Sequence, residues 1–163
     1  GFYNRGKFDS DIVNFCFEYS EQAQEDSLAV LIMFDIDHFK RFNDDFGHQK
    51  GDEVLRLVAK KVRENTTEAA NVYRYGGEEF CITAYFDTIN DIIAFADCIR
   101  LAIAKLVIRK KHDVTAKRAI SASFGLAILR PFTNSSVLVE RADRALYIAK
   151  THGRNRIEIA PDI

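Results

Sequence analysis

The feature that most constrains the fold is the wholly apolar run LAVLIMF at residues 28–34. Because this run does not alternate between apolar and polar residues, it predicts a central strand buried on both faces. A strand of this kind lies inside a sheet that other elements cover. The run is also far shorter than the ~20 residues that a membrane-spanning helix requires.

Segments with helical periodicity lie on both sides of this strand. Apolar side chains recur at helical spacing within 8–23, and further amphipathic helices are predicted within 89–106 and 138–149. Thr88 and Asp91 match a capping box at the start of the helix predicted within 89–106. A short helix, a turn and a longer helix are predicted directly after the central strand.

A β-hairpin is predicted around the paired glycines Gly76 and Gly77. The flanking residues 71–75 and 78–86 are rich in aromatic and apolar types. A two-residue Gly-Gly connection favours a hairpin in which both glycines adopt positive φ.

The remaining segments complete one α+β domain. Strands are predicted within 119–129 and 156–160, whereas residues 107–118 give no firm assignment. The order α-β-α-α-β-β-α-β-α-β, with antiparallel strands and helices gathered on the sheet, indicates a ferredoxin-like fold. The 163 residues fit a single domain, 1–163, with a real core.

Composition excludes several classes of protein. A net charge of −1 gives no argument for a nucleic-acid-binding surface, which usually shows an excess of Lys and Arg. The three cysteines have no CxxC spacing and the four histidines are scattered, so no zinc pattern exists and a cytoplasmic location is favoured. Because the chain begins at Gly1 without an initiator methionine, we expect a domain excised from a longer protein.

Two aspartates end the predicted central strand. A buried charge is costly unless it is paired or bound to metal, which favours Asp35 as a metal ligand. For Asp37, directly before HFKRF, the pattern favours an N-cap of the next helix. The start of that helix offers unpaired N–H groups to a phosphate, and Lys40 adds a charge one turn in.

The stretch RYGGEEF places two adjacent glutamates beside the paired glycines. Glu78 and Glu79 point to opposite faces of the strand, so only one can meet Asp35 if the hairpin pairs beside the central strand. Carboxylates from neighbouring strand ends, with phosphate oxygens, suit Mg²⁺ and phosphoryl transfer. An exposed acidic turn is the alternative, but it does not explain the apolar strand that follows at once.

These motifs together resemble the GGDEF family of diguanylate cyclases. The resemblance is carried by RYGGEEF, with Glu at its third motif letter in place of Asp, and by DIDHFKRFNDDFGHQKGDEVL. ISASFGLA and RADRALYIAKTHGRNRI match the same family in order and spacing, and GFYNRGKF resembles the end of its opening motif. The resemblance covers essentially the whole chain and implies a nucleotidyl-cyclase fold with a mostly antiparallel five-stranded sheet under helices.

The resemblance also implies roles for the matching residues. Asp35 and Glu78 would bind Mg²⁺, with Mn²⁺ as the alternative ion, and Ile36 would add its backbone carbonyl. Glu78, Glu79 and Lys40 would act in catalysis, Glu78 by assisting deprotonation of the attacking 3′-hydroxyl. The residues implied to bind the substrate GTP are His38, Phe39, Lys40, Lys150 and Arg154 at the triphosphate, and Asn43, His48 and Asp52 at the guanine.

Ordinary structural roles remain open for the same residues. Asp52 could be a first-turn residue favoured by the helix dipole, and Asn43 a turn former. Lys150 and Arg154, four residues apart, could be an exposed basic face. Guanine nevertheless presents N1–H and N2–H₂ donors, which suit a carboxylate such as Asp52 better than adenine does.

The implied activity is the condensation of two GTP molecules into cyclic di-GMP and two pyrophosphates across an antiparallel homodimer. An upstream sensory or dimerisation region would control the rate, and the domain itself would contact neither nucleic acid nor membrane. The alternative is a catalytically weak or inactive GTP-binding regulatory domain. Many family members carry an inhibitory RxxD product site, but Thr67 and Ala70 occupy its two key positions here, so we expect none.

Overall fold

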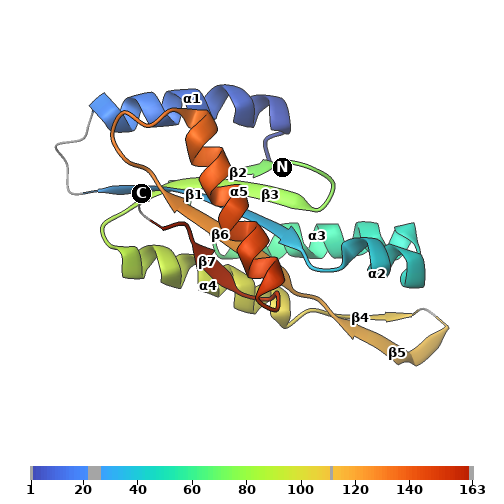
Figure 1. The fold of residues 1–163 in the computed structure, drawn as a ribbon. Coiled ribbons are helices and arrows are strands. Elements are labelled where there is room, and N and C mark those ends of the chain that lie inside the picture. The colour runs from blue at the N-terminus through green and yellow to red at the C-terminus, as the bar shows by residue number, and fades with distance from the viewer. Residues whose placement is uncertain (1, 22–26, 111, 162–163) are drawn as a thin grey trace.

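A five-stranded sheet in the order β2-β3-β1-β6-β7 runs through the centre of the protein (Figure 1). The computed structural model describes residues 2–21, 27–110 and 112–161. All neighbouring strands are antiparallel except β6 and β7, which are parallel. The strands are β1 (Leu28–Ile36), β2 (Asn71–Arg74), β3 (Glu79–Phe86), β6 (Ala122–Ile128) and β7 (Ile157–Ile159).

The central position predicted for the apolar run is confirmed. β1 pairs with β3 on one edge and β6 on the other, and its residues are buried from Ala29 to Ile36. Two clusters of buried side chains, one on each face of the sheet, form the core. The α+β class predicted from the order of elements is therefore confirmed.

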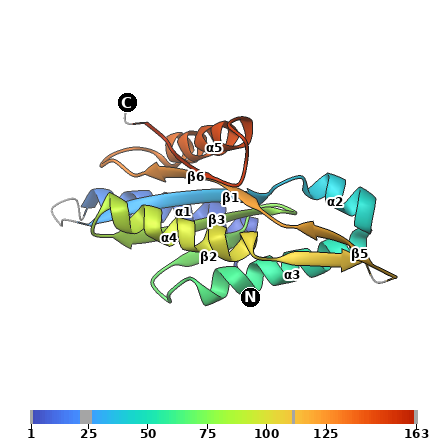
Figure 2. The same ribbon diagram turned by 90° about the horizontal axis from the view of Figure 1, so that it is seen from below.

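Helices cover both faces of the sheet (Figures 1 and 2). The hydroxyl oxygen of Thr88 accepts a hydrogen bond from the backbone N–H of Asp91 at 3.1 Å, which confirms Thr88 as the N-cap of the predicted helix. Ala23, in the first predicted helix, lies outside the described residues. One face carries α1 (Arg5–Glu21) and α5 (Ser135–Thr151), the other α3 (His48–Glu64) and α4 (Ile89–Ala104), and α2 (Phe39–Phe46) joins β1 to α3.

The helix α5 lies directly on the strand β6. A Cβ atom added at Gly125 would lie 2.3 Å from the carbonyl oxygen of Ala142 and 2.3 Å from the backbone nitrogen of Leu146. Backbone atoms cannot yield as a flexible side chain can, so this contact requires glycine. Within the described ranges, no helix has the length and apolar character needed to cross a lipid bilayer.

A row of stacked aromatic rings crosses three strands of the sheet. Phe34 on β1 is in register with Phe80 on β3 and Phe124 on β6. The ring centroids lie 5.0 Å apart for Phe34 and Phe80 and 4.6 Å apart for Phe34 and Phe124. The next row of the sheet, one residue further along β1, contains Asp35, Glu79 and Ser123.

The predicted hairpin of β2 and β3 is confirmed, but its predicted turn is wrong. Neither Gly76 nor Gly77 has positive φ. The backbone N–H groups of Tyr75 and Gly76 both donate to the carbonyl of Glu79, at 2.8 and 3.1 Å. The guanidinium of Arg74 binds the carbonyls of Gly76 and Gly77. A longer connection closed by this arginine therefore replaces the two-residue turn.

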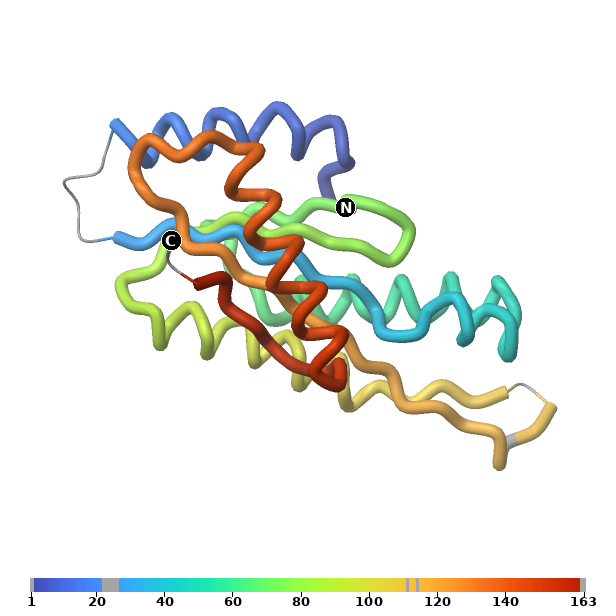
Figure 3. The backbone as a smooth tube through the Cα atoms, in the orientation of Figure 1, coloured from blue at the N-terminus to red at the C-terminus, as the bar shows by residue number. Residues whose placement is uncertain are grey.

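A second hairpin, which the sequence left unassigned, extends beyond the sheet beside α2 and α3 (Figure 3). It consists of β4 (Val107–Lys110) and β5 (Asp113–Ala119). Among the described side chains of these two strands, only Ile108 is buried. An ion pair of 2.8 Å between Arg118 and Asp45 connects the hairpin to α2.

Candidate nucleotide and cation site

Asp35 is a buried carboxylate at the end of β1, with only 4% of its surface exposed. Its Oδ2 lies 2.6 Å from the ammonium nitrogen of Lys150, which reaches it from α5. Its Oδ1 is buried and has no hydrogen-bond partner in the described part of the chain. One oxygen of this carboxylate therefore pairs with the Lys150 ammonium, and the other has no hydrogen-bond partner among the described residues.

The surroundings of Asp35 disfavour its negative charge. Burial raises the pKa of the Asp35 carboxyl to about 6, although the hydrogen bond and charge of Lys150 act in the opposite direction. The negative charges of Glu79 and Glu78 raise this pKa further. Burial therefore outweighs the effect of Lys150, and a further cation at the free oxygen would favour the ionised carboxylate.

The donor set around Asp35 fits a divalent cation that takes part of its ligands from a nucleotide. The Lys150 ammonium already stands where a cation would bind, and the free Oδ1 is a hard oxygen donor. Within residues 2–21, 27–110 and 112–161, however, no group of three His, Cys, Asp or Glu side chains is close enough to hold a metal. Backbone carbonyls and phosphate oxygens would have to complete the coordination.

The two glutamates of RYGGEEF occupy different positions. Glu79 is the register partner of Asp35, and its carboxylate lies against Gly76, where an added Cβ would be 2.7 Å from Oε2. Glu78 precedes β3, and its backbone carbonyl accepts a hydrogen bond of 3.2 Å from the N–H of Ile36. The sheet therefore pairs Asp35 with Glu79, while Glu78 flanks the end of β1.

Asp37 is not the helix cap that the sequence predicted. The N-cap of α2 is His38, and no side chain caps this helix. The two carboxylate oxygens of Asp37 instead accept hydrogen bonds of 2.6 Å from the hydroxyls of Ser121 and Ser123. These partners, more than 80 residues away along the chain, bind the carboxylate strongly because the hydrogen bonds are charge-assisted.

The start of α2 has no side-chain cap. His38 has a left-handed backbone (φ 55°), after which the helix begins at Phe39 without a side-chain cap. The first N–H groups of a helix have no partner within it and favour negative charge. Lys40 is exposed in this first turn, as the prediction of a phosphate cradle requires.

The predicted guanine-binding residues gather where α2 meets α3. The amide oxygen of Asn43 is buried without a hydrogen-bond partner among the described atoms. It lies directly over Gly51, where an added Cβ would be only 1.8 Å away. Asp52 and His48 are exposed in the first turns of α3. This end of the site therefore has an unsatisfied acceptor beside exposed polar groups.

Lys150 and Arg154, which the sequence grouped together, lie in different environments. Lys150 is bound to Asp35 in the site itself. Arg154 is exposed in the turn after α5, with a left-handed backbone (φ 63°), and its side chain has no polar partner in the described segments. They do not form a continuous basic face.

Several residues of this region had no distinctive sequence signal. Ser121 and Ser123 bind Asp37, and the only indication of them was the presence of hydroxyls in an otherwise apolar strand. Gly51, which makes room for Asn43, looked like an ordinary helix-interior glycine. Arg100 on α4 contacts the turn that carries Arg154, and nothing local to its sequence indicates this.

Comparison with known proteins gives a single family. The family model for "Diguanylate cyclase, GGDEF domain" matches residues 1–156. Diguanylate cyclase VdcA of Vibrio cholerae serotype O1 is 38% identical over 157 residues, which cover 96% of this chain and 44% of VdcA. Diguanylate cyclase DosC of Escherichia coli K12 is 39% identical over 132 residues, which cover 81% of this chain and 28% of DosC.

A solved structure gives the same result. The GGDEF domain of DgcB from Caulobacter crescentus, crystallised in complex with c-di-GMP, has a TM-score of 0.89 and 34% identity. The match covers 98% of this chain and 91% of that one, whereas the chain spans less than half the length of VdcA and DosC. On fold, sequence and the segments that build the site, the chain belongs to the diguanylate cyclase GGDEF domain family.

Proposed function

We propose that this domain condenses two GTP molecules into cyclic di-GMP and two pyrophosphates. The observation that supports this most directly is the buried Asp35, with one oxygen on the Lys150 ammonium and the other unpartnered, next to the open start of α2. A buried carboxylate that needs a cation beside a phosphate cradle suits a metal-dependent nucleotidyl transfer.

The cation in this proposal is Mg²⁺, with Mn²⁺ as the alternative. Asp35 and Glu78 would hold it through their carboxylates, and Ile36 through its backbone carbonyl. The register places Glu79 opposite Asp35, so the Glu78 carboxylate would have to reach the ion from the residue before β3, beside Ile36. Hard oxygen donors and a shared phosphate are the ligands that Mg²⁺ prefers. When bound, the ion would act as a Lewis acid, which neutralises charge on the phosphate and favours ionisation of the 3′-hydroxyl.

The protein's own groups would orient and neutralise the triphosphate. The backbone N–H groups of His38 and Phe39 would donate to it, and Lys40 would contribute a point charge. Arg154 would contact the phosphates from the turn after α5. Lys150, which lies on Asp35, would contact a phosphate oxygen of the bound nucleotide instead.

Two glutamates and three polar residues complete the assignment. Glu78 would assist removal of the proton from the attacking 3′-oxygen, and Glu79, the register partner of Asp35, would shape the charge around it. At the other end Asn43, Asp52 and His48 would bind the guanine. The unpartnered Oδ1 of Asn43 supports this role, because base donors would satisfy it.

Each domain has one such site, whereas the product joins two nucleotides symmetrically. We therefore propose an antiparallel encounter of two copies, each presenting its GTP to the other. A longer parent protein with a sensory region would set the encounter rate by raising the effective concentration of the domains. The free thiols of Cys16, Cys81 and Cys98 are compatible with a cytoplasmic location.

The test is incubation of the domain at high concentration with GTP and Mg²⁺, followed by identification of the product by mass. We expect cyclic di-GMP and pyrophosphate, and no cyclic product with ATP. Glu78→Gln should abolish the product because it removes a cation ligand at constant shape. Glu68→Gln is the matched control, since Glu68 is an exposed glutamate of the loop before β2.

Three outcomes would count against the proposal. Bound GTP without any cyclic product, with or without added divalent cation, would support the alternative of a regulatory GTP-binding domain. Full activity of the Glu78→Gln protein would remove Glu78 from the cation site. Equal turnover of GTP and ATP would contradict the assignment of Asn43 and Asp52.

We further propose that the product does not inhibit this domain through an RxxD site. Thr67 is exposed and Ala70 half-buried, and the N–H of Ala70 donates to the carbonyl of Thr67 at 3.1 Å. Neither side chain offers a guanidinium or a carboxylate to a guanine base. Added cyclic di-GMP should therefore cause no noncompetitive inhibition in initial-rate measurements. Inhibition that disappears when Thr67 or Ala70 is replaced would contradict this.

A further inference from the structure

The turn between α5 and β7 has an unusual backbone. Gly153, Arg154 and Asn155 have φ values of 122°, 63° and 46°, so three consecutive residues lie in the left-handed region. Glycine adopts this conformation readily and asparagine tolerates it, but arginine does not favour it. Such a turn persists only when contacts from outside hold it in place.

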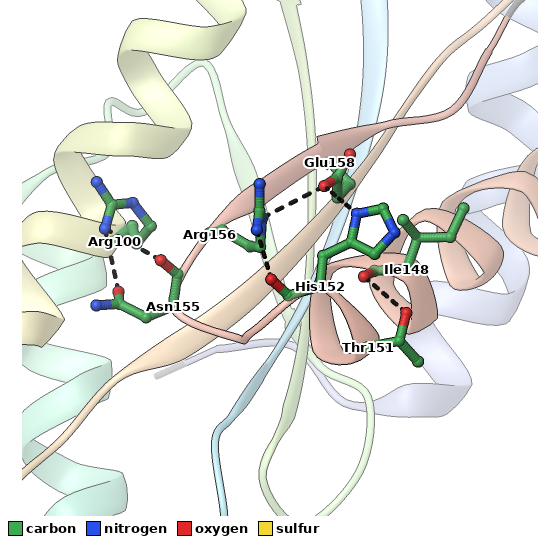
Figure 4. A network of polar contacts seen from close by, with 7 residues as sticks. All are labelled: Arg100, Ile148, Thr151, His152, Asn155, Arg156 and Glu158. Carbon is green, nitrogen blue, oxygen red and sulfur yellow. Dashed lines mark hydrogen bonds and ion pairs between the residues drawn. The ribbon is translucent and has the colours of Figure 1, made fainter.

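Two charged side chains from distant elements hold Asn155. The Asp37 carboxylate, after β1, accepts a hydrogen bond of 3.0 Å from the Asn155 N–H. The Arg100 guanidinium, on α4, donates to the Asn155 carbonyl at 3.3 Å and to its Oδ1 at 3.1 Å (Figure 4). The N–H, the carbonyl and the side chain of Asn155 are thus all engaged.

Both of these side chains are themselves fixed. The carboxylate of Asp37 is held by the hydroxyls of Ser121 and Ser123, and Ser123 is completely buried. Arg100 is held by Asp97, whose carboxylate lies 2.7 Å from its Nε. We call Asp37, Arg100 and Asn155 the turn clamp. It connects the end of β1 and α4 to one residue of the turn.

We infer that the turn clamp positions Arg154 for the nucleotide phosphates, an inference that rests on the proposed function. Arg154 precedes the clamped residue, and its own N–H donates to the carbonyl of Ala149 at 3.0 Å, so its backbone is fixed on both sides. Asp37 lies between Asp35 and the start of α2. The clamp therefore keeps the base of Arg154, whose exposed side chain has no polar partner in the described part of the chain, beside both the cation site and the phosphate cradle.

Attachment of β7 to the sheet does not depend on the turn clamp. The N–H of Phe124 donates to the carbonyl of Arg156 at 2.9 Å, and the N–H of Ala160 donates to that of Leu126 at 2.7 Å. β7 also pairs in parallel register with β6 from Phe124 to Leu126. Asp37 and Arg100 are therefore positioning residues whose effect passes through Arg154.

The test is a double-mutant cycle on the binding of a GTP analogue with a methylene bridge between its α and β phosphorus atoms, measured by calorimetry with Mg²⁺. Arg100→Met should weaken binding about fivefold, and Arg154→Met at least as much. In the Arg154→Met background, Arg100→Met should have no further effect. Additive losses would show that Arg100 does not act through Arg154 and would overturn the inference.

Further variants separate positioning from folding. Arg100→Lys should recover part of the affinity, and Asn155→Gly should weaken binding with little loss of stability, because glycine accepts positive φ. Arg144→Met is the control, since it breaks another arginine–carboxylate pair on a helix, with Glu140, away from the turn. Unchanged affinity in both Arg100→Met and Asn155→Gly would overturn the inference. Because the cycle measures binding, absence of cyclic di-GMP would count only against the proposed function.

Discussion

The two ends of the candidate site are built in different ways. The cation end is held by charge: a carboxylate that is 4% exposed, an ammonium at 2.6 Å, and two flanking glutamates. The base end is held by shape: the Asn43 amide lies over Gly51 in a space that one methyl group would fill. Substitutions that remove a charge should therefore impair the cation end, and substitutions that add volume should impair the base end.

This difference determines what each end can tolerate. At the cation end, every buried charge depends on its neighbours, so removal of one changes both stability and affinity. At the base end, the polar groups of Asp52 and His48 are exposed, and their loss leaves no buried charge behind. Three substitutions or conditions test this contrast, in decreasing order of expected effect.

The largest effect is expected from Asp35→Asn. Loss of the negative charge should lower the rate of cyclic di-GMP formation about 10³-fold, equivalent to about 4 kcal/mol, because the cation loses its buried ligand. The measurement is the initial rate at saturating GTP, with Asp44→Asn on the exposed face of α2 as control. A rate within tenfold of the unsubstituted protein would mean that the cation end does not depend on this charge.

The second effect concerns pH and stability of the metal-free protein. The pKa of Asp35 is about 6 when folded and 3.8 ordinarily, so between these values the folded state holds a proton that the unfolded state releases. The free energy of unfolding should therefore fall by about 2 to 3 kcal/mol, through this group, as pH rises from about 4 to about 6.5.

Denaturant titrations of the unsubstituted and Asp35→Asn proteins at several pH values isolate this contribution. The difference between them should grow with pH and then stay constant above about pH 6.5. Bound Mg²⁺ and nucleotide should reduce it, since a cation favours the ionised form. A difference that does not change with pH would contradict the raised pKa.

The smallest effect is expected at the base end, from Gly51→Ala. The added methyl group must displace the Asn43 amide, so the KM for GTP should rise about tenfold and discrimination against ATP should fall. Stability should be unchanged or higher by roughly 0.5–1 kcal/mol, because alanine favours the helix interior. Unchanged kinetics together with a lower melting temperature would show that Gly51 serves packing alone.

The elements that the sequence predicted well have strong local patterns. The uninterrupted apolar run predicted β1, and helical spacing of apolar residues predicted α5, where Leu138, Ala142 and Ala149 are buried. The β4–β5 hairpin was missed because most of its described side chains are exposed and charged residues interrupt its apolar ones. Its one buried described side chain, Ile108, gives no periodicity to detect.

The contacts of the site residues could not be predicted from the sequence, because they depend on strand pairing between distant segments. The sequence showed that only one glutamate could face Asp35, but the register that selects Glu79 depends on how β3 aligns with β1. Asp37 looked like a cap because its local surroundings suit one, whereas its partners are Ser121, directly before β6, and Ser123 on β6. Local patterns indicated which residues matter, and tertiary packing decided what they contact.

The stacked rings of Phe34, Phe80 and Phe124 have a consequence for how the domain could change over time. A slip of one residue between β1 and either neighbour would break this stack and also turn Asp35 towards the opposite layer of helices. The aromatic row therefore fixes the strand register that places the acidic row beside it. Substitutions in the β4–β5 hairpin, which takes no part in this register, leave it unchanged.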